Sequence, residues 1–305
     1  MPKNSRLCKG LCMVMALCCM VLWGTSCGQE PQKKWSQENI QEEPKISLFI
    51  NDTGEKKQIM MEEYITGVVA AEMEPSWPIQ ALAAQAILAR TFTMENIVAG
   101  RVRDLHGTDA STSVEEFQAY DPSRINDAVR QAVESTRGQV ATFQGEYIKA
   151  WFSACDGGIS ASAWEGLAYN KTPTDYLQVG VKDDCLSITT DENRYWQAAI
   201  PLEQVRAAVK KVTGTDPGAI QTAVILQKGD SGRAETIQIG QVQVGGPALR
   251  LALGGDKVRS MLLDKIFIQG NQMIFVGKGY GHGVGMCQWG AKRLATLGKS
   301  PQDIV

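Results

Sequence analysis

An alanine-rich stretch constrains the fold of this chain more than any other feature. Residues 79–94 carry apolar side chains at helical spacing, and Pro78 is typical of the first turn of a helix. Five of these residues are alanine, and such small side chains permit another element to pack closely against the helix. The sequence therefore predicts a buried, closely packed helix. A length of 305 residues suits one large domain or two intimate lobes around it.

Helices and strands are expected to alternate irregularly along the rest of the chain. Helical patterns lie at residues 62–73, 126–136 and 202–212 and from residue 288 onward. Strand patterns lie at residues 46–50, 57–60, 223–227, 235–239, 249–253 and 273–276, with a hairpin over 140–152. This order predicts an α+β fold rather than a doubly wound sheet.

The N-terminus has the pattern of an export signal. Basic residues precede an apolar stretch, residues 11–23, that is shorter than the ~20 residues of a spanning helix. Cys27 resembles a lipoprotein cleavage site, whereas in an uncleaved signal anchor it would serve only as a small apolar group. Both alternatives predict an extracytoplasmic, membrane-tethered protein. The expected parts are a signal peptide or anchor over 1–28, a linker over 29–45 and a folded domain over 46–305.

The net charge and the histidine content limit the partners and the kinds of site that the chain can have. The net charge of −2, with no basic run in the sequence, predicts that nucleic acid is not a partner. Only His106 and His282 occur, so a three-histidine metal site is excluded. Any Ser-His-Asp triad must use one of these two.

Three cysteines follow the N-terminal segment: Cys155, Cys185 and Cys287. An odd number cannot pair completely, and Cys155 with Cys185 is the expected bridge because both lie in the same middle segment. The alternative is a zinc site made of the three cysteines and His282. No pair has tight ligand spacing, so no metal cofactor is expected.

Glu72 is a candidate general acid. It follows the apolar residues 68–71, and apolar surroundings raise the pKa of a carboxyl group, so that it stays protonated near neutral pH. The alternative is a glutamate at a helix end that pairs with a basic residue such as Arg90. The pattern by itself favours this second interpretation.

A glycine-rich loop at residues 277–291 is the second candidate. Its alternate glycines permit positive φ and close approach of the backbone to a ligand. It lacks the features of a phosphate-binding or dinucleotide-binding loop. The alternative is a tight bend with a capping histidine. The side chains that suit this loop to hold a sugar are Tyr280, His282, Gln288 and Trp289.

A third stretch, residues 151–158, ends in Gly157 and Gly158, which also suggest close backbone approach. Ser153 lies there and could join His282 and an aspartate in a hydrolase triad. No G-x-S-x-G elbow surrounds Ser153, which argues against that triad.

Four segments together resemble the SpoIID family, the group of stage II sporulation protein D and amidase enhancer. They are Glu63-Tyr-Ile-Thr-Gly-Val-Val-Ala-Ala-Glu-Met, Ala81-Leu-Ala-Ala-Gln-Ala-Ile-Leu-Ala-Arg-Thr, Tyr176-Leu-Gln-Val and Gly279-Tyr-Gly-His-Gly-Val-Gly-Met-Cys-Gln-Trp-Gly-Ala. The resemblance runs from about residue 46 to the C-terminus. Family members usually end later, which implies that this chain is truncated.

The resemblance implies a lytic transglycosylase that cleaves the β-1,4 bond between N-acetylmuramic acid and N-acetylglucosamine, leaving a 1,6-anhydro end. Family members prefer glycan stripped of stem peptides. The family's essential acid falls on Glu72, which reverses the preference for a structural glutamate. We expect a central glycan-binding groove between two lobes. The residues expected to bind substrate are Arg90, Ser153, Gly157, Gly158, Tyr176, Tyr280, His282 and Gln288.

Two departures from the family pattern concern the site. Cys287 stands where the family often has serine, and Ser153 where many members have histidine or a neutral residue. One member is described with zinc, but its ligands are not all matched here.

The implied partners are peptidoglycan strands, a cell-wall amidase and a membrane protein of the engulfment machinery. The alternatives are a non-catalytic glycan-binding enhancer of an amidase, or a hydrolase that uses Cys155 or Cys287 with His282.

Overall fold

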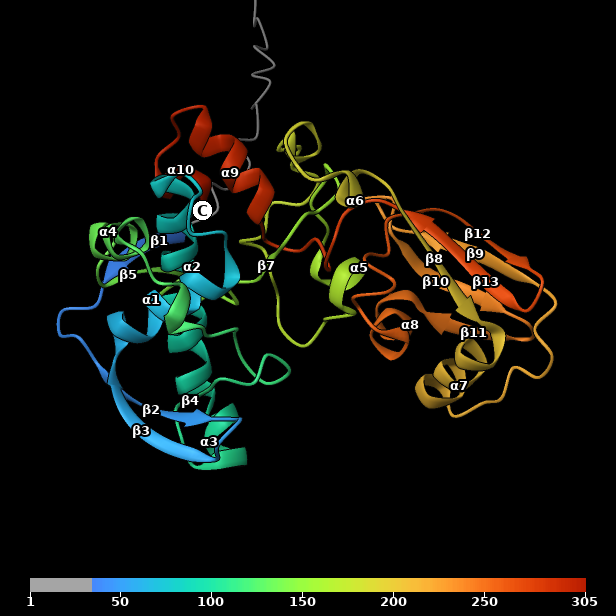
Figure 1. Ribbon diagram of the computed structural model, residues 1–305, viewed down its shortest axis with the longest axis horizontal. Coiled ribbons are helices and arrows are strands. Elements are labelled where there is room, and N and C mark those ends of the chain that lie inside the picture. Colours follow the sequence, from blue (N-terminus) through green and yellow to red (C-terminus); the bar gives the residue numbers. More distant parts are fainter. Residues whose placement is uncertain (1–34) are drawn as a thin grey trace, which may run out of the picture. The chain divides into compact units, whose positions relative to one another are not determined.

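The computed structural model describes residues 35–305 and has the α+β fold that the sequence predicts (Figure 1). Its first elements are β1 (Trp35–Asn39), β2 (Lys45–Ile50), β3 (Glu55–Met60), α1 (Met61–Glu72), α2 (Ile79–Ala99), α3 (Arg101–His106), β4 (Ala110–Ser111), the 3₁₀ turn η1 (Pro122–Arg124), α4 (Asp127–Ser135), β5 (Gln139–Phe143) and β6 (Glu146–Tyr147).

The remaining elements are β7 (Phe152–Ser153), α5 (Ala163–Leu167), the 3₁₀ turn η2 (Cys185–Ser187), α6 (Asp191–Arg194), β8 (Trp196–Pro201), α7 (Leu202–Thr213), β9 (Ala223–Lys228), β10 (Ala234–Ile239), β11 (Val242–Gly245), α8 (Gly246–Leu253), β12 (Leu263–Gln269), β13 (Gln272–Gly277), β14 (Met286–Cys287), α9 (Gln288–Thr296) and α10 (Pro301–Ile304). None of the helices over residues 35–305 is long and apolar enough to cross a membrane. The predicted signal segment, residues 1–28, lies outside the described residues.

The first hydrophobic core surrounds α2, the buried helix that the sequence predicts. All of its alanines between residues 79 and 94 are fully buried, and α1, α4 and α9 pack against the helix. Side chains from the end of the chain, among them Ala291 and Ile304, belong to the same core as Val68 of α1. The last helices, α9 and α10, thereby pack against α2, although they lie far from it in sequence.

A second hydrophobic core lies between residues 196 and 275. Two three-stranded antiparallel sheets, ordered β12-β13-β8 and β11-β10-β9, form it with α7 and α8. The predicted strand over residues 249–253 is wrong, because this stretch belongs to α8. Leu249 and Leu253 are one helical turn apart and both face the core, whereas Leu251 is 71% exposed.

The predicted hairpin over residues 140–152 is only partly right. β5 and β6 pair as expected, but the chain then leaves this sheet. β7 instead pairs in parallel with β14, so that Ser153 lies opposite Cys287. Because β7 leaves the sheet of β5 and β6 and pairs with β14, the segment that carries Ser153 lies against the glycine-rich loop.

The predicted linker over residues 29–45 is also corrected. Residues Trp35–Asn39 form strand β1, which pairs antiparallel with β5 over its whole length. The physical reason is that β5 offers an open edge of backbone donors and acceptors, which an extended polar segment can satisfy as well as an apolar one. A central groove stays a prediction.

Candidate active site

Glu72 is the last residue of α1 and is half-buried. The helix ends there because Met73 has extended backbone angles, and Pro75 follows. Oε1 of Glu72 accepts a hydrogen bond from the backbone amide of Ala119 at 2.9 Å. Burial raises the pKa of Glu72 above its ordinary value, while hydrogen bonds from Ala119 and Gln288 oppose that rise. The net shift favours the protonated acid.

Gln288 comes from the far end of the glycine-rich loop, where it begins α9. Its side chain is 6% exposed, and its Nε2 donates to Oε1 of Gln85 on α2 at 3.3 Å. Nε2 of the fully buried Gln85 has no hydrogen-bond partner among the described residues. A chain of amide groups therefore leads from the α2 interior to the carboxyl of Glu72.

Two tryptophans lie close in sequence to Glu72 and Gln288. Trp77 follows α1, and Trp289 follows Gln288 directly. The centroids of their rings are 4.7 Å apart. The ammonium of Lys292 lies 4.9 Å from the Trp77 ring centroid and 4.4 Å from that of Trp289. Aromatic faces of this kind stack on sugar rings. Trp77 was not predicted as a site residue, although its place between Pro75 and Pro78 is typical of a turn.

Arg90 does not pair with Glu72. It is fully buried and forms two hydrogen bonds to Glu62, Nε to Oε1 at 2.9 Å and Nη2 to Oε2 at 2.6 Å. A third nitrogen, Nη1, donates to the carbonyl of Gln139 at 2.8 Å. The alternative of a structural Glu72–Arg90 pair is therefore wrong. The burial of Arg90 also gives no support to its expected role as a substrate contact.

Ser153 and Gly157 lie against the glycine-rich loop, whereas Gly158 lies against Leu186 of η2. Ser153 is 6% exposed, and its Oγ has no partner within the described part of the chain. Gly157 has φ +76°, and a Cβ there would lie 2.7 Å from Cδ2 of Leu262 and 3.4 Å from the carbonyl oxygen of Lys278. The first of these glycines is thus explained by packing between chain segments.

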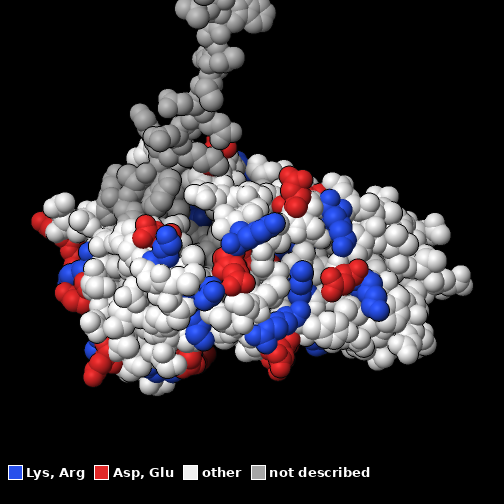
Figure 2. All heavy atoms as spheres, turned by 90° about the horizontal axis from the view of Figure 1, so that it is seen from above, with Lys and Arg blue, Asp and Glu red and all other residues white. Residues whose placement is uncertain are grey.

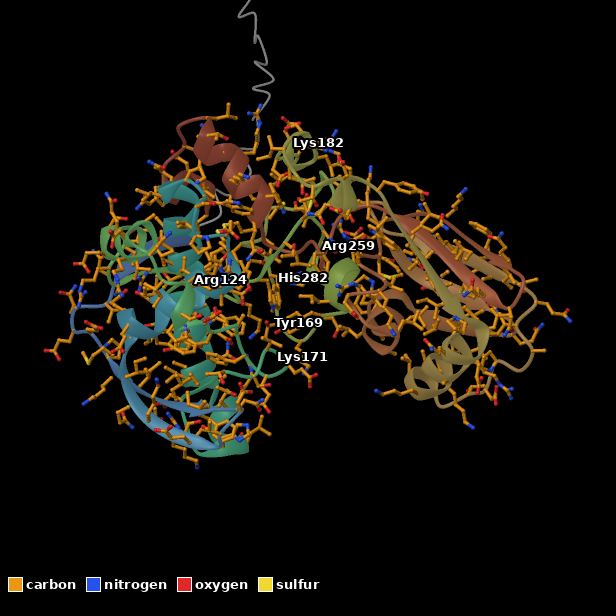
Figure 3. The ribbon with its side chains drawn as sticks, viewed as in Figure 1. Arg124, Tyr169, Lys171, Lys182, Arg259 and His282 are labelled. Carbon is orange, nitrogen blue, oxygen red and sulfur yellow. The ribbon has the colours of Figure 1, made fainter. Side chains whose placement is uncertain are left out.

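His282 is a half-buried residue whose Nδ1 accepts from the backbone amide of Val284 at 3.0 Å. Burial, and then the charges of Arg250 and Arg233, lower the pKa of His282 to about 3. It is therefore neutral at physiological pH. In the view of Figure 3 it lies between Arg124 of η1 and Arg259, which stands between α8 and β12 in the sequence.

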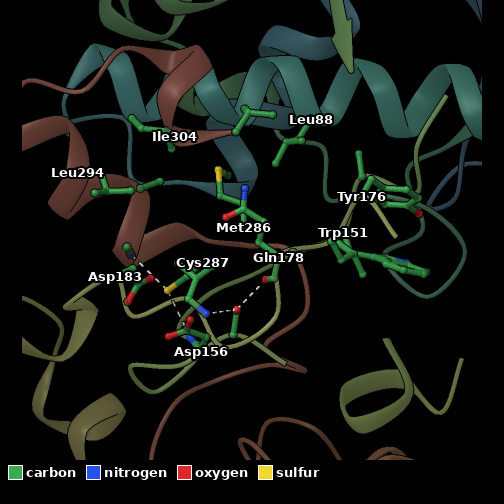
Figure 4. Close-up of a pocket in the computed structure, with 18 of the residues that line it drawn as sticks. Leu88, Trp151, Asp156, Tyr176, Gln178, Asp183, Met286, Cys287, Leu294 and Ile304 are labelled. Carbon is green, nitrogen blue, oxygen red and sulfur yellow. Dashed lines mark hydrogen bonds between the residues drawn. The ribbon is translucent and has the colours of Figure 1, made fainter. Parts of the chain in front are cut away.

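Tyr280 and Tyr176 have separate surroundings. The guanidinium of Arg259 lies 4.0 Å from the Tyr280 ring centroid, a cation–π contact. The Tyr176 hydroxyl accepts from the backbone amide of Lys149 at 3.1 Å. Tyr176 also lines a cavity of about 410 Å³ with Trp151, and Glu72 is not among the residues that line it (Figure 4).

The three described cysteines lie together as free thiols. Cys155 and Cys185 are neighbours, as expected, but their sulfurs are 3.5 Å apart and form no bridge. Sγ of Cys287 accepts from the backbone amides of Gly290 and Asp156, and His282 makes its contact with Val284 instead. The polar contacts of Cys287 and His282 give no support to the cysteine–histidine hydrolase.

One face of the molecule carries both signs of charge. Lysine and arginine side chains alternate there with aspartate and glutamate (Figure 2). Neither sign of charge dominates this face.

Comparison with known proteins gives two family matches. The family described as stage II sporulation protein, SpoIID, matches residues 51–143, which include Glu72 and Ala119. A domain of unknown function, DUF8618, matches residues 170–285.

Several known proteins are similar to the chain. An uncharacterised protein of Brachyspira hyodysenteriae is 32% identical over 253 residues, which cover 81% of this chain and 64% of that protein. Stage II sporulation protein D of Bacillus subtilis is 27% identical over 302 residues, 92% of this chain and 82% of that protein. The amidase enhancer of Bacillus subtilis is 26% identical over 287 residues, 79% of this chain and 39% of that protein.

Proposed function

Because the chain belongs to the SpoIID family, we propose that it acts on the bacterial cell wall during sporulation. The proposed activity is that of a lytic transglycosylase. It cleaves the β-1,4 bond between N-acetylmuramic acid and N-acetylglucosamine in glycan strands without stem peptides. The products end in 1,6-anhydro-N-acetylmuramic acid.

The observation that supports this activity best is the setting of Glu72. Its carboxyl group has a raised pKa and is oriented by the amide of Ala119. Gln288, from the glycine-rich loop, contacts the same group. A protonated carboxyl held by a fixed donor is what protonation of a glycosidic oxygen requires.

In the proposed reaction Glu72 acts twice. Its proton passes to the glycosidic oxygen as the bond from that oxygen to the anomeric carbon of the muramic acid breaks, with positive charge developing on the ring. The C6 hydroxyl of the same sugar then attacks the anomeric carbon, and its proton returns to the Glu72 carboxylate. The enzyme is restored, and no water is consumed.

The other parts of the site bind the sugar in this proposal. Gln288 keeps the Glu72 carboxyl in one orientation, and Trp77 with Trp289 offers an aromatic surface for sugar rings. Neutral His282 and Tyr280 contribute polar contacts from the loop. The N-terminal segment tethers the protein outside the cytoplasm, where an amidase and a membrane protein are the proposed partners.

A second candidate is a glycan-binding protein that stimulates an amidase and has no catalytic activity of its own. The similarity to the amidase enhancer of Bacillus subtilis favours it. This candidate needs the aromatic surface and the loop, but it makes no use of the raised pKa of Glu72.

The test uses the full chain, purified in detergent and incubated with glycan strands from which an amidase has removed the stem peptides. Mass spectrometry of the products should show anhydro-muramic ends for the wild type. Glu72→Gln should abolish them and still bind glycan in a sedimentation assay. The control is Glu74→Gln, an exposed glutamate that pairs with Arg124, and it should retain activity.

Three outcomes decide between the candidates. Anhydro products from the wild type but not from Glu72→Gln support the transglycosylase. A wild type that binds glycan, stimulates an amidase and releases no anhydro product supports the enhancer. Equal product from Glu72→Gln and the wild type would remove Glu72 from the mechanism.

A further inference from the structure

A short segment between β4 and η1 carries the backbone amide that binds Glu72. This segment, the strap, consists of residues 117–121. Its central residue, Ala119, donates its N–H to Oε1 of Glu72 at 2.9 Å. A backbone donor moves only with its own chain segment, so the contacts that hold the strap also place this hydrogen bond.

The first end of the strap is fixed to α2. Gln118 is 2% exposed, and its Nε2 donates to Oγ1 of Thr93 at 3.1 Å and to the carbonyl oxygen of Ala89 at 3.4 Å. The ring of Phe117 packs edge-on against that of Phe92, with centroids 5.2 Å apart. Polar and aromatic contacts together therefore hold this end on one face of the buried helix.

The second end of the strap is fixed to α1. The ring of Tyr120 stacks on that of the fully buried Tyr64, with centroids 5.5 Å apart and planes inclined by 14°. The backbone amide of Asp121 donates to the carbonyl oxygen of Gly67 at 3.1 Å. Burial most of all, and also the charge of Glu72, raise the pKa of the Tyr64 hydroxyl. This end of the strap is therefore attached to α1 close to the acid.

Gly67 makes room for the Tyr120 ring. It is buried in the middle of α1, where alanine favours the helix more than glycine does. A Cβ at Gly67 would lie 2.3 Å from Cε2 of Tyr120 and 2.7 Å from Cδ2. Carbon atoms in contact are about 3.5–4.0 Å apart, so any side chain here would displace the ring. The glycine is explained by this close approach and not by the helix.

We propose that Gly67 and Tyr120 are positioning residues, which set where the Ala119 amide meets the carboxyl group of Glu72. The inference rests on the proposed role of Glu72 as the acid. Neither residue touches the sugar. The Tyr120 ring lies against the bare backbone of Gly67 and so fixes the strap, and the strap directs the N–H of Ala119 to the carboxyl oxygen. That donor orients the acid and stabilises the carboxylate that remains after proton transfer.

Positioning and simple packing predict different effects of Gly67→Ala. Burial raises the pKa of Glu72, and the hydrogen bond from Ala119 opposes that rise. An alanine that pushes the strap outward should weaken the hydrogen bond, so that the pKa rises further. A substitution that only disturbed the packing would lower the stability and leave the pKa of Glu72 unchanged.

The test measures the titration of Glu72 directly. The full chain, in detergent, carries glutamate labelled with carbon-13 at Cδ, and the Glu72 signal is the one that Glu72→Gln removes. Its midpoint should lie at higher pH in Gly67→Ala and in Tyr120→Ala than in the wild type. Tyr120→Phe keeps the ring and should keep the midpoint. Gly240→Ala is the matched control, because its Cβ would lie 2.9 Å from the carbonyl oxygen of Pro217, outside the strap, and its midpoint should not move.

Two further measurements separate positioning from a general loss of structure. In the Tyr120→Ala background, Gly67→Ala should shift the midpoint no further, because the ring through which the added Cβ acts is gone. In the activity assay, Gly67→Ala should lower kcat by up to about 100-fold at acidic pH, where Glu72 is protonated in both proteins, with KM nearly unchanged.

Separate results would overturn this proposal and the proposed function. A folded Gly67→Ala protein whose Glu72 titrates as in the wild type would overturn the positioning role, and so would additive shifts in the double variant. If Gly67→Ala does not fold, the midpoint of Tyr120→Ala decides in the same way. The titration needs no substrate, so a wild type that releases no anhydro product refutes the transglycosylase while the midpoints still decide the positioning role.

Discussion

The backbone amide of Ala119 donates a hydrogen bond to Oε1 of Glu72 at 2.9 Å, although 47 residues separate them in sequence. A backbone donor is fixed by the path of the chain, so it orients the carboxyl group without the entropic cost of ordering a second side chain. The same bond opposes the rise in pKa that burial causes. The acid is therefore held in place by a contact that also limits how far its pKa rises.

The activity should fall as pH rises. Burial raises the pKa of Glu72, and only the protonated form can donate to the glycosidic oxygen. The rate of anhydro product formation should be highest below the folded-state pKa and decline as pH increases through it. A pH profile of kcat checks this, and a rate that rises across that range would contradict the assigned role.

The same shift predicts a pH-dependent difference in stability. A folded-state pKa above the unfolded value contributes stability that is fully present below the unfolded pKa, about 4.3, and is lost as pH rises through the folded pKa. Glu72→Gln stays neutral, so its melting temperature relative to wild type should be higher at neutral than at acidic pH. The exposed Glu74→Gln control should show no such change, and a constant difference for Glu72→Gln would refute the prediction.

Gln288→Leu should move the pH profile upward. The hydrogen bond from Gln288 lowers the pKa of Glu72, so its removal lets burial raise that pKa further. The midpoint of the decline in kcat should shift to higher pH. Gln221→Leu, at an exposed glutamine, is the control and should leave the midpoint unchanged. A uniform loss of rate with no shift would assign Gln288 a structural role only.

Arg90→Met should cost about 3–5 kcal/mol of unfolding free energy, because it leaves the buried carboxylate of Glu62 without its partner. Urea unfolding measures this, and the double variant Glu62→Leu with Arg90→Met should recover part of the loss. Arg293→Met, which breaks a more exposed pair with Asp184, should cost about 1 kcal/mol or less. Loss of glycan binding by a folded Arg90→Met protein would restore the substrate role that burial does not support.

Gly285→Ala should destabilise the protein more than Gly298→Ala. Both residues have positive φ, +72° and +81°, so each alanine brings about 1–2 kcal/mol of backbone strain. A Cβ at Gly285 would also lie 2.0 Å from the carbonyl oxygen of Trp151, whereas Gly298 has open space. The difference in unfolding free energy measures that contact, and equal losses would mean that the β7–β14 region can move apart freely.

Much of the fold was predictable because local pattern and burial agree. The alanine-rich helix, α1, α4 and β5 with β6 all follow their periodicity and turn signals. The strand predicted at residues 249–253 was wrong because leucine at every second position matches the period of a strand, although the segment is too short to exclude a helix. Only the packing of Leu249 and Leu253 on one helical face decided it.

The features of the candidate site also divide into those that the sequence shows and those that only the tertiary structure shows. Sequence by itself determined that Glu72 ends an apolar helix, that the glycine-rich loop contains His282 and Gln288, and that only three cysteines follow the N-terminal segment. Tertiary structure alone decided that Ala119 and Gln288 meet Glu72, that Arg90 pairs with Glu62, and that the three thiols share one buried point. The reason is that these contacts join segments up to about 200 residues apart, and hydrophobic packing, which is not directional, chooses such partners only when the whole core forms.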